Sequence, residues 1–206
     1  MARILNFIKT LQKNIIFSKR DIKKAFPDIY PARLTEWQKA GYLKKITNNF
    51  YISSDLVINE QVLFLISNKI YDPSYVSLET ALSYYGLIPE QVFNVTCIST
   101  NRIKTFKTVL GNFTFKRVPL ELYFGYKTIK CGQLNFKIAD KEKTILDYFY
   151  QHRHLRTKTD FESVRLNREE LQNTLDKQKL EQYLTKYRSK TFVRTINKLI
   201  KYIYHD

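Results

Sequence analysis

The stretch YPARLTEWQKAGYLKK, residues 30–45, decides how the first quarter of the chain folds. Pro31 suits the first turn of a helix, where its missing N–H costs nothing, and Gly41 suits the left-handed residue that ends one. Leu34 and Trp37 lie three residues apart and share one helical face, so both are expected to point into a core. We therefore predict a helix from Pro31 up to Gly41, followed at once by a basic strand.

The residues before this stretch predict two more helices and a short strand. The apolar pattern of residues 3–13 is typical of an amphipathic helix, and IIF at 15–17 is typical of an extended segment. Ser18 and Asp21 match a capping box, so a second helix is expected to begin there and to end at Pro27.

The residues after it predict a β-hairpin. YLKKI and FYI are two strand-like runs, and Asn48-Asn49 between them suits a turn because asparagine tolerates positive φ. The resulting order is helix, strand, helix, helix, hairpin. This is the order of a winged helix-turn-helix, in which the third helix enters the major groove of DNA and the hairpin lies along the backbone.

The charge of the chain favours a polyanionic partner. It has 35 Lys and Arg against 19 Asp and Glu, a formal net charge of +16. Residues 1–52 hold 11 basic and 3 acidic residues, so a net of +8 lies in the first quarter. Cations that neutralise phosphates release the counterions condensed on nucleic acid, which favours binding. The uneven distribution points to the N-terminal segment as the DNA-binding one.

Candidate DNA contacts follow from the predicted elements. The outward face of the third helix is expected to face the bases, through Arg33, Thr35, Glu36 and Lys39. The start of the second helix and the hairpin are expected to face phosphates, through Lys19, Arg20, Lys44, Lys45, Asn48 and Asn49. The plainer alternative is a solvated basic surface, and Trp37 is better explained as a core residue than as a base-stacking one.

The C-terminal helices carry a further basic set. Its members are Lys186, Arg188, Lys190, Arg194 and Lys198. They form either a second polyanion surface or simply the solvated face of a helix. The pattern alone leaves both open.

The predicted fold class is α+β. A winged helix-turn-helix is expected in residues 1–55, and a mixed α/β C-terminal domain in residues 56–206. The second domain is expected to contain a small antiparallel sheet and to end in helices. One hairpin is predicted over 106–119 with its turn at Gly111-Asn112.

Catalytic and metal-binding patterns are sparse. His152 and His154 are two residues apart, a spacing that does not aim both at one point from a helix. Asp140, Glu142 and Asp147 are interpreted as a helix cap, a first-turn residue and a surface carboxylate. We therefore predict no enzyme, no cofactor and no metal site.

Cysteine usage and hydropathy predict a cytoplasmic protein. Cys97 and Cys131 are isolated from each other and from histidines, which is typical of buried thiols in a reducing compartment. No apolar stretch approaches the roughly 20 residues that span a bilayer, so no membrane partner is expected.

Several blocks beyond residue 75 resemble one family. They are SLETALSYYGL (77–87), FKRVPLELYFG (115–125), ADKEKTILDYFY (139–150) and FESVRLNREEL (161–171). Together with the N-terminal pattern, they make nearly the whole chain similar to the AbiEi family. Members of this family are antitoxins of type IV bacterial toxin–antitoxin modules, which were first associated with phage abortive infection.

The resemblance implies two roles. The N-terminal domain would bind inverted repeats in the promoter of its own module and repress it, with Pro31–Ala40 as the reading helix and Leu43–Ile52 as the wing. The C-terminal domain would counteract a nucleotidyltransferase-like toxin without forming a stable complex with it. The alternative is a winged-helix protein-interaction module without sequence-specific DNA binding.

This sequence departs from the family at the wing. Family wings often carry an Arg-Gly pair before a hydrophobic-Tyr pair, whereas Asn48-Asn49 precedes Phe50-Tyr51 here. A guanidinium contact from the wing tip is therefore not expected.

Overall fold

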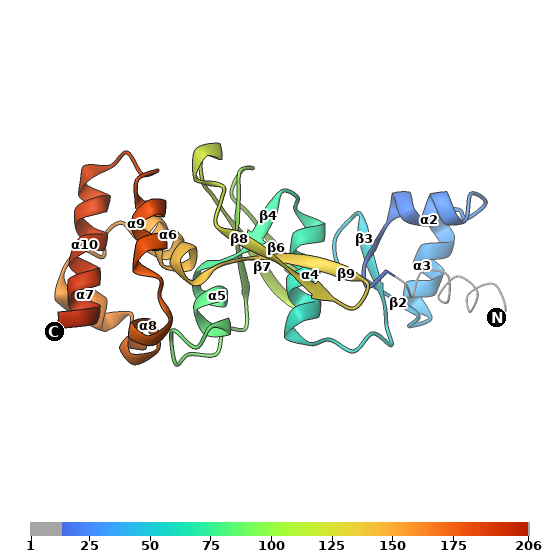
Figure 1. Cartoon of the computed structure of the whole chain (residues 1–206). Coiled ribbons are helices and arrows are strands. Elements are labelled where there is room, and N and C mark those ends of the chain that lie inside the picture. The colour runs from blue at the N-terminus through green and yellow to red at the C-terminus, as the bar shows by residue number, and fades with distance from the viewer. Residues whose placement is uncertain (1–13, 206) are drawn as a thin grey trace.

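The computed structural model describes residues 14–205, which form an elongated α/β molecule with two sheets (Figure 1). The helices of the N-terminal segment lie at one end, the larger sheet lies in the middle, and the C-terminal helices lie at the other end. The helix predicted over residues 3–13 lies outside the described residues. Among the described helices, none combines the length and apolar character that crossing a bilayer requires.

The N-terminal segment forms two helices and a small antiparallel sheet. Its elements are β1 (Phe17–Ser18), α2 (Lys19–Ala25), α3 (Pro31–Lys39), β2 (Leu43–Lys45) and β3 (Phe50–Ser53). The strand order is β1-β3-β2. The predicted capping box is confirmed, since the Asp21 amide donates to Ser18 Oγ and the Ser18 amide donates to Asp21 Oδ2.

A compact apolar cluster holds these elements together. Phe17 and Tyr51 from the sheet and Ile22 from α2 pack with Leu34 and Leu43, and all are buried. Trp37 is half-buried against the same cluster, as the spacing from Leu34 predicted. The role of Trp37 is therefore to anchor α3.

The β2–β3 connection differs from the predicted two-residue turn. Residues 46–49 form it, and both the Ile46 and the Thr47 amide donate to the Phe50 carbonyl. Neither Asn48 nor Asn49 has a positive φ. A four-residue connection of this kind closes the hairpin without left-handed residues, so the conformational preference of asparagine is not needed.

The larger sheet is six-stranded and mixed, which corrects the prediction of a small antiparallel sheet. Its strands are β4 (Ser74–Val76), β5 (Val95–Ser99), β6 (Lys104–Thr108), β7 (Gly111–Arg117), β8 (Tyr126–Cys131) and β9 (Leu134–Ala139). The order is β6-β7-β5-β4-β9-β8. Two pairings, β5 with β7 and β4 with β9, are parallel.

The parallel pairings explain why local patterns underestimated the sheet. Two antiparallel hairpins, β6–β7 and β8–β9, are joined through the central strands β4 and β5. The pairing of β4 with β9 joins strands that lie far apart in sequence. The turn of the first hairpin is also displaced from Gly111-Asn112. Thr108 pairs with Gly111, so Val109 and Leu110 form the turn.

The helices cover this sheet and extend beyond it. They are α4 (Glu60–Ile70), α5 (Leu78–Tyr84), the 3-10 turn η1 (Leu120–Leu122), α6 (Lys141–Gln151), α7 (Lys158–Ser163), α8 (Arg168–Thr174), α9 (Lys177–Leu184) and α10 (Lys190–His205). The last helix buries one apolar face, which contains Phe192, Ile196, Leu199 and Ile203. This face packs into the core of the C-terminal helices.

Apolar contact crosses the predicted domain boundary near residue 55. Ile46 and Ile52 of the hairpin region share one cluster with Phe64 and Leu65 of α4 and with residues of the larger sheet. Each half therefore stabilises the other through burial of apolar surface.

A buried ionic network joins α6 to the sheet and to the C-terminal helices. Lys143 and Asp147 form an ion pair in which both side chains are 0% exposed. Tyr75 Oη and Ser77 Oγ each donate to Asp147 Oδ2 at 2.9 Å, and Lys143 Nζ donates to Tyr187 Oη at 3.1 Å. Every polar atom of the pair therefore has a nearby partner, as buried charges require.

This network corrects part of the sequence interpretation. Asp140 caps α6 as predicted, accepting from the Lys143 amide at 2.8 Å. Asp147 is not a surface carboxylate, and Glu142, although in the first turn, is also buried. A Lys–Asp pair four residues apart is typical of a helix surface, and only packing against distant segments buries this one.

Gly125 is predicted to be intolerant of any side chain. Its φ is +71°, and a Cβ there would lie 2.9 Å from Lys143 Cβ and 2.9 Å from Tyr183 Cε2. We expect Gly125→Ala to destabilise the protein by roughly 2–4 kcal/mol, combining left-handed strain with overpacking. Urea unfolding followed by circular dichroism measures this.

Gly132 supplies the matched control for that substitution. Its φ is +61°, but a Cβ there would meet nothing within 4 Å. Gly132→Ala is expected to cost only the backbone strain, about 1 kcal/mol. Equal losses in the two variants would show that packing around Gly125 contributes nothing.

Candidate nucleic-acid interface

Helix α3 exposes most of its surface to solvent. Leu34 is buried and Trp37 is half-buried, and Gln38 Nε2 donates back to the Leu34 carbonyl at 3.0 Å. The four side chains predicted to face bases are all exposed: Arg33, Thr35, Glu36 and Lys39. The helix is therefore free along the face that the sequence assigned to DNA.

Two of these four side chains pair with each other. Arg33 Nη1 lies 2.7 Å from Glu36 Oε2, and the two side chains are 56% and 58% exposed. An exposed pair one helical turn apart is worth only a few tenths of a kcal/mol. Arg33 can therefore exchange Glu36 for an anionic or guanine acceptor at little cost.

The start of α2 and the hairpin tip are adjacent. The Lys19 amide donates to the Asn49 carbonyl at 2.9 Å. This bond brings together Lys19, Arg20 and Asn49, three of the residues predicted to face phosphates, and all three are exposed. Neutral amide and cationic donors at one place suit the oxygens of a phosphate backbone.

The hairpin separates Lys44 from Lys45. Consecutive strand residues point to opposite faces, and Lys44 pairs with Ile52 whereas Lys45 pairs with Tyr51. Tyr51 packs in the cluster with α2 and α3, while Ile52 packs toward α4 and the larger sheet. Lys45 therefore lies on the side of α3, and Lys44 lies on the other side.

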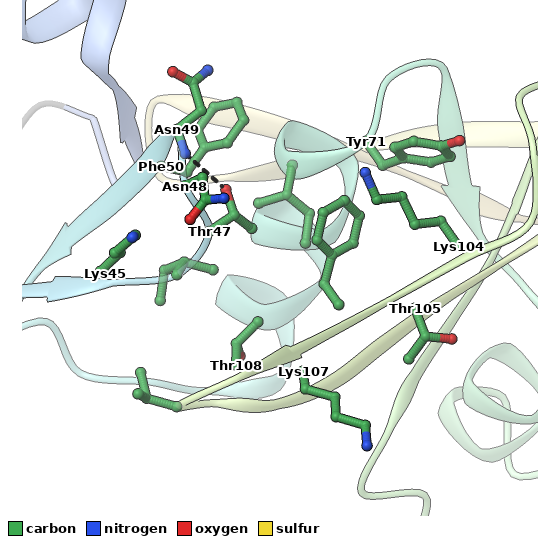
Figure 2. Close-up of a pocket in the computed structure, with 14 residues that line it drawn as sticks. Lys45, Thr47, Asn48, Asn49, Phe50, Tyr71, Lys104, Thr105, Lys107 and Thr108 are labelled. Atoms are coloured by element: carbon green, nitrogen blue, oxygen red, sulfur yellow. Dashed lines mark hydrogen bonds between the residues drawn. The ribbon is translucent and has the colours of Figure 1, made fainter.

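A groove of about 920 Å³ lies beside the hairpin tip (Figure 2). Residues 45–50 form one side, and β6 of the larger sheet forms the other. The side chain of Lys104 points toward the ring of Tyr71, whereas the side chain of Lys107 points away from that ring (Figure 2). Lys104 Nζ also lies 4.5 Å from the ring centroid of Phe106, a cation–π contact.

Lys104 and Lys107 were missed in the sequence. They lie more than fifty residues after the hairpin, and only the tertiary fold brings β6 beside it. The signal in the sequence is the KTFKT strand, where two lysines flank one aromatic residue. Lysine on an edge strand also discourages edge-to-edge aggregation, so the pattern alone does not indicate binding.

The predicted C-terminal basic set does not lie on one helix. Lys190, Arg194 and Lys198 are exposed on α10, four residues apart along one face. Lys186 lies before the helix, with its Nζ 4.1 Å from the ring centroid of Phe124. Arg188 is exposed in the same α9–α10 connection.

The remaining polar groups do not form a reactive cluster. His152 Nδ1 lies 2.9 Å from the Tyr148 carbonyl oxygen, and its Nε2 lies 3.7 Å from Glu79 Oε1. Burial raises the pKa of the Cys97 thiol to about 12, which keeps it protonated and unreactive. Within residues 14–205, no three His, Cys, Asp or Glu side chains gather as metal ligands would.

The sequence was compared with models of known protein families and with curated proteins, and neither comparison gives a match.

Proposed function

We propose that the protein binds double-stranded DNA through its N-terminal segment, which acts as a winged helix-turn-helix. In this proposal, α3 enters the major groove and the β2–β3 hairpin is the wing. Phosphate contacts come from Lys19, Arg20 and Lys45.

The observation that carries the proposal is the exposure of α3 beside an excess of cations. One turn of the helix, at Leu34 and Trp37, anchors it, and its other faces are open. Residues 14–53 contain eight Lys and Arg but only three acidic residues, Asp21, Asp28 and Glu36. Asp21 caps α2 and Glu36 pairs with Arg33, so two of the three have local roles.

We further propose the biological role that the family resemblance implies. The protein would repress the promoter of its own module and act as the antitoxin against a nucleotidyltransferase-like toxin. The blocks at 77–87 and 139–150 support this role, because they are the most specific part of the resemblance. The antitoxin activity would reside in the C-terminal part, without a stable complex with the toxin.

Lys45 is expected to contribute more to DNA binding than Lys44. It lies on the α3 side of the hairpin, so Lys45→Ala should weaken binding to every duplex and reduce the salt slope, −dlogK/dlog[salt], by about 1. Fluorescence anisotropy of a labelled duplex over a salt titration measures the slope.

Lys44→Ala is the matched control, because it removes the same charge from the opposite face of the same strand. Its slope should stay near that of the wild type. A larger loss from Lys44 than from Lys45 would place the DNA on the wrong side of the hairpin.

The alternative, a protein-interaction module, predicts a different result from the same titration. Exposed apolar side chains near the N-terminal segment, Tyr30 at 78% and Val57 at 79% exposure, favour it. In that case neither lysine variant would change DNA binding at any salt concentration.

A further inference from the structure

Two adjacent pockets lined by cations form a second groove. It lies beside α10, at the end of the molecule opposite to α3 (Figure 1). It runs between α10 and the segment that leads from α6 into α7. Its pockets are lined by the cations Arg153, Arg156, Lys158, Lys198 and Lys201. Lys190 and Arg194 line neither pocket but precede Lys198 on α10. With Arg153, Arg156, Lys198 and Lys201, they make a set of six exposed cations. Only three of these six belong to the basic set that the sequence suggested.

The cations of α10 repel each other without compensation. Lys190, Arg194 and Lys198 follow one another at four-residue spacing, and Lys201 follows three residues later. Like charges at these spacings destabilise a helix, and α10 contains no acidic residue to offset them. None of the six cations forms an ion pair with a carboxylate of residues 14–205. A row of unpaired cations on one helical face suits a polyanion.

The two arginines opposite α10 are held in place through their inner nitrogens. Arg156 Nε donates to the Arg153 carbonyl at 2.6 Å, and Arg153 Nε donates to the Tyr150 carbonyl at 3.3 Å. The Arg153 guanidinium also stacks over the Tyr150 ring, with Cζ 4.3 Å from the centroid. Within residues 14–205, the outer Nη donors of both groups form no ion pair and remain available. Arginines ordered in advance lose less conformational entropy on binding a phosphate.

Two adjacent pockets divide the groove, and Arg156 lines both. One, of about 250 Å³, is also lined by Arg153, Ser189 and Thr191. The other, of about 350 Å³, is also lined by Lys198 and Lys201. Among residues 14–205, no carboxylate lines either pocket. Consecutive anion-sized pockets along one groove suit consecutive phosphates of a chain.

The burial of the aromatic residues in the groove favours a duplex over a single strand as its ligand. Phe161, Phe192 and Tyr202 line the pockets but are at most 9% exposed. Binding of single strands depends on exposed aromatic rings on which bases stack, and these rings are covered. A double helix keeps its base faces stacked inside, so a protein can bind it through the backbone alone and needs no such platform.

We propose that this groove binds the phosphodiester backbone of a nucleic-acid duplex, independently of α3. Arg153 and Arg156 bind successive phosphates through their outer donors, and the α10 cations follow the same strand. Because α3 and α10 lie at opposite ends of the molecule, the protein has two separate duplex-binding surfaces. This second site does not depend on the function proposed for the N-terminal segment.

The test is a salt titration of full-length variants by fluorescence anisotropy. The probes are a short DNA duplex of arbitrary sequence, the RNA duplex of the same sequence, and one single strand. Arg153→Gln/Arg156→Gln is compared with Arg102→Gln/Lys130→Gln, which removes the same charge from exposed residues elsewhere. Arg153→Lys/Arg156→Lys keeps the charge and loses the planar fork. Thermal unfolding confirms that each variant is folded.

We expect the Arg153/Arg156 glutamine variant to lower the salt slope by roughly 2 and duplex affinity on the order of tenfold. The lysine variant should recover the slope but only part of the affinity, and the Arg102/Lys130 control should change little. Whether the glutamine variant loses affinity for the DNA duplex, the RNA duplex or both identifies which duplex the groove binds. Equal losses in the glutamine variant and the control, or a greater loss for the single strand, would overturn the proposal.

The same titration separates this site from the N-terminal one. Combined with Lys45→Ala, the arginine variant should bind duplex more weakly than either variant alone, because each single variant keeps one intact site. If Lys45→Ala has no effect while the arginine variant does, the proposed N-terminal function fails and this one stands. The reverse result retains the N-terminal site and rejects the groove.

Discussion

Asp147→Ala is expected to destabilise the folded protein by about 3–5 kcal/mol. The substitution leaves the Lys143 ammonium, which is 0% exposed, without the carboxylate of Asp147, its one carboxylate partner among residues 14–205. It also removes the acceptor of the Tyr75 and Ser77 hydroxyl groups. Denaturant unfolding measures the loss as a lower midpoint. A change below about 1 kcal/mol, the size of an ordinary surface substitution, would contradict the network as described.

The double variant Lys143→Met/Asp147→Leu is the matched control. It removes both charges and fills the space with apolar side chains of similar volume. Burial raises the pKa of Asp147 even though Lys143, Ser77 and Tyr75 act to lower it, so this site disfavours charge. The double variant should therefore lose much less stability than Asp147→Ala alone. If it loses more, the ion pair itself stabilises the fold.

Arg33→Ala/Lys39→Ala is expected to reduce affinity for the specific DNA site on the order of a hundredfold or more. Both side chains extend from the exposed face of α3, and each base contact in the major groove contributes roughly 1–3 kcal/mol. Affinity for unrelated duplexes should fall much less. The specificity ratio, which is the affinity for the specific site divided by that for unrelated duplexes, should therefore fall sharply. Competition binding with specific and unrelated duplexes measures the ratio.

Lys23→Ala/Lys24→Ala is the control for this experiment. Both lysines are exposed in the last turn of α2, and their removal takes away the same charge. This variant should weaken both kinds of duplex alike and leave the specificity ratio unchanged. Equal loss of specificity in the two variants would mean that α3 does not read bases.

Local signals in the sequence predicted the ends of the N-terminal helices well, but they misplaced the turns of two hairpins. Ser18 with Asp21, Pro31 and Gly41 each mark a helix end by hydrogen bonding or backbone geometry that a few neighbouring residues determine. The apolar face of α10 follows equally from helical periodicity. These features depend on residues within one or two turns, which is why one sequence suffices.

Features that depend on distant residues were not predictable. The parallel pairing of Val76 with Ile138 joins strands about sixty residues apart, and no local pattern indicates it. Asp147 looked like a surface residue because its burial depends on packing against Tyr75 and Ser77, which lie about seventy residues away.

The residues that line the two cationic grooves were only partly predictable for the same reason, because they come from distant parts of the sequence. The sequence identified Lys45 in the hairpin and Lys190, Arg194 and Lys198 on α10. It did not identify Lys104, Arg153 and Arg156, which tertiary packing brings to the two grooves. Whether a basic residue belongs to a binding surface depends on its neighbours in space, and counting charges along the chain does not identify those neighbours.

The most direct test of the central claim is binding to the DNA upstream of the protein's own reading frame. The labelled upstream fragment is titrated with the protein in a gel-shift experiment at about 0.15 M salt, with unlabelled unrelated duplex in excess. We predict a shifted complex that survives the competitor and disappears in Arg33→Ala/Lys39→Ala. A fragment that stays unshifted, or a complex that the unrelated duplex removes as readily as the upstream one, would contradict the claim that α3 is a DNA-reading helix.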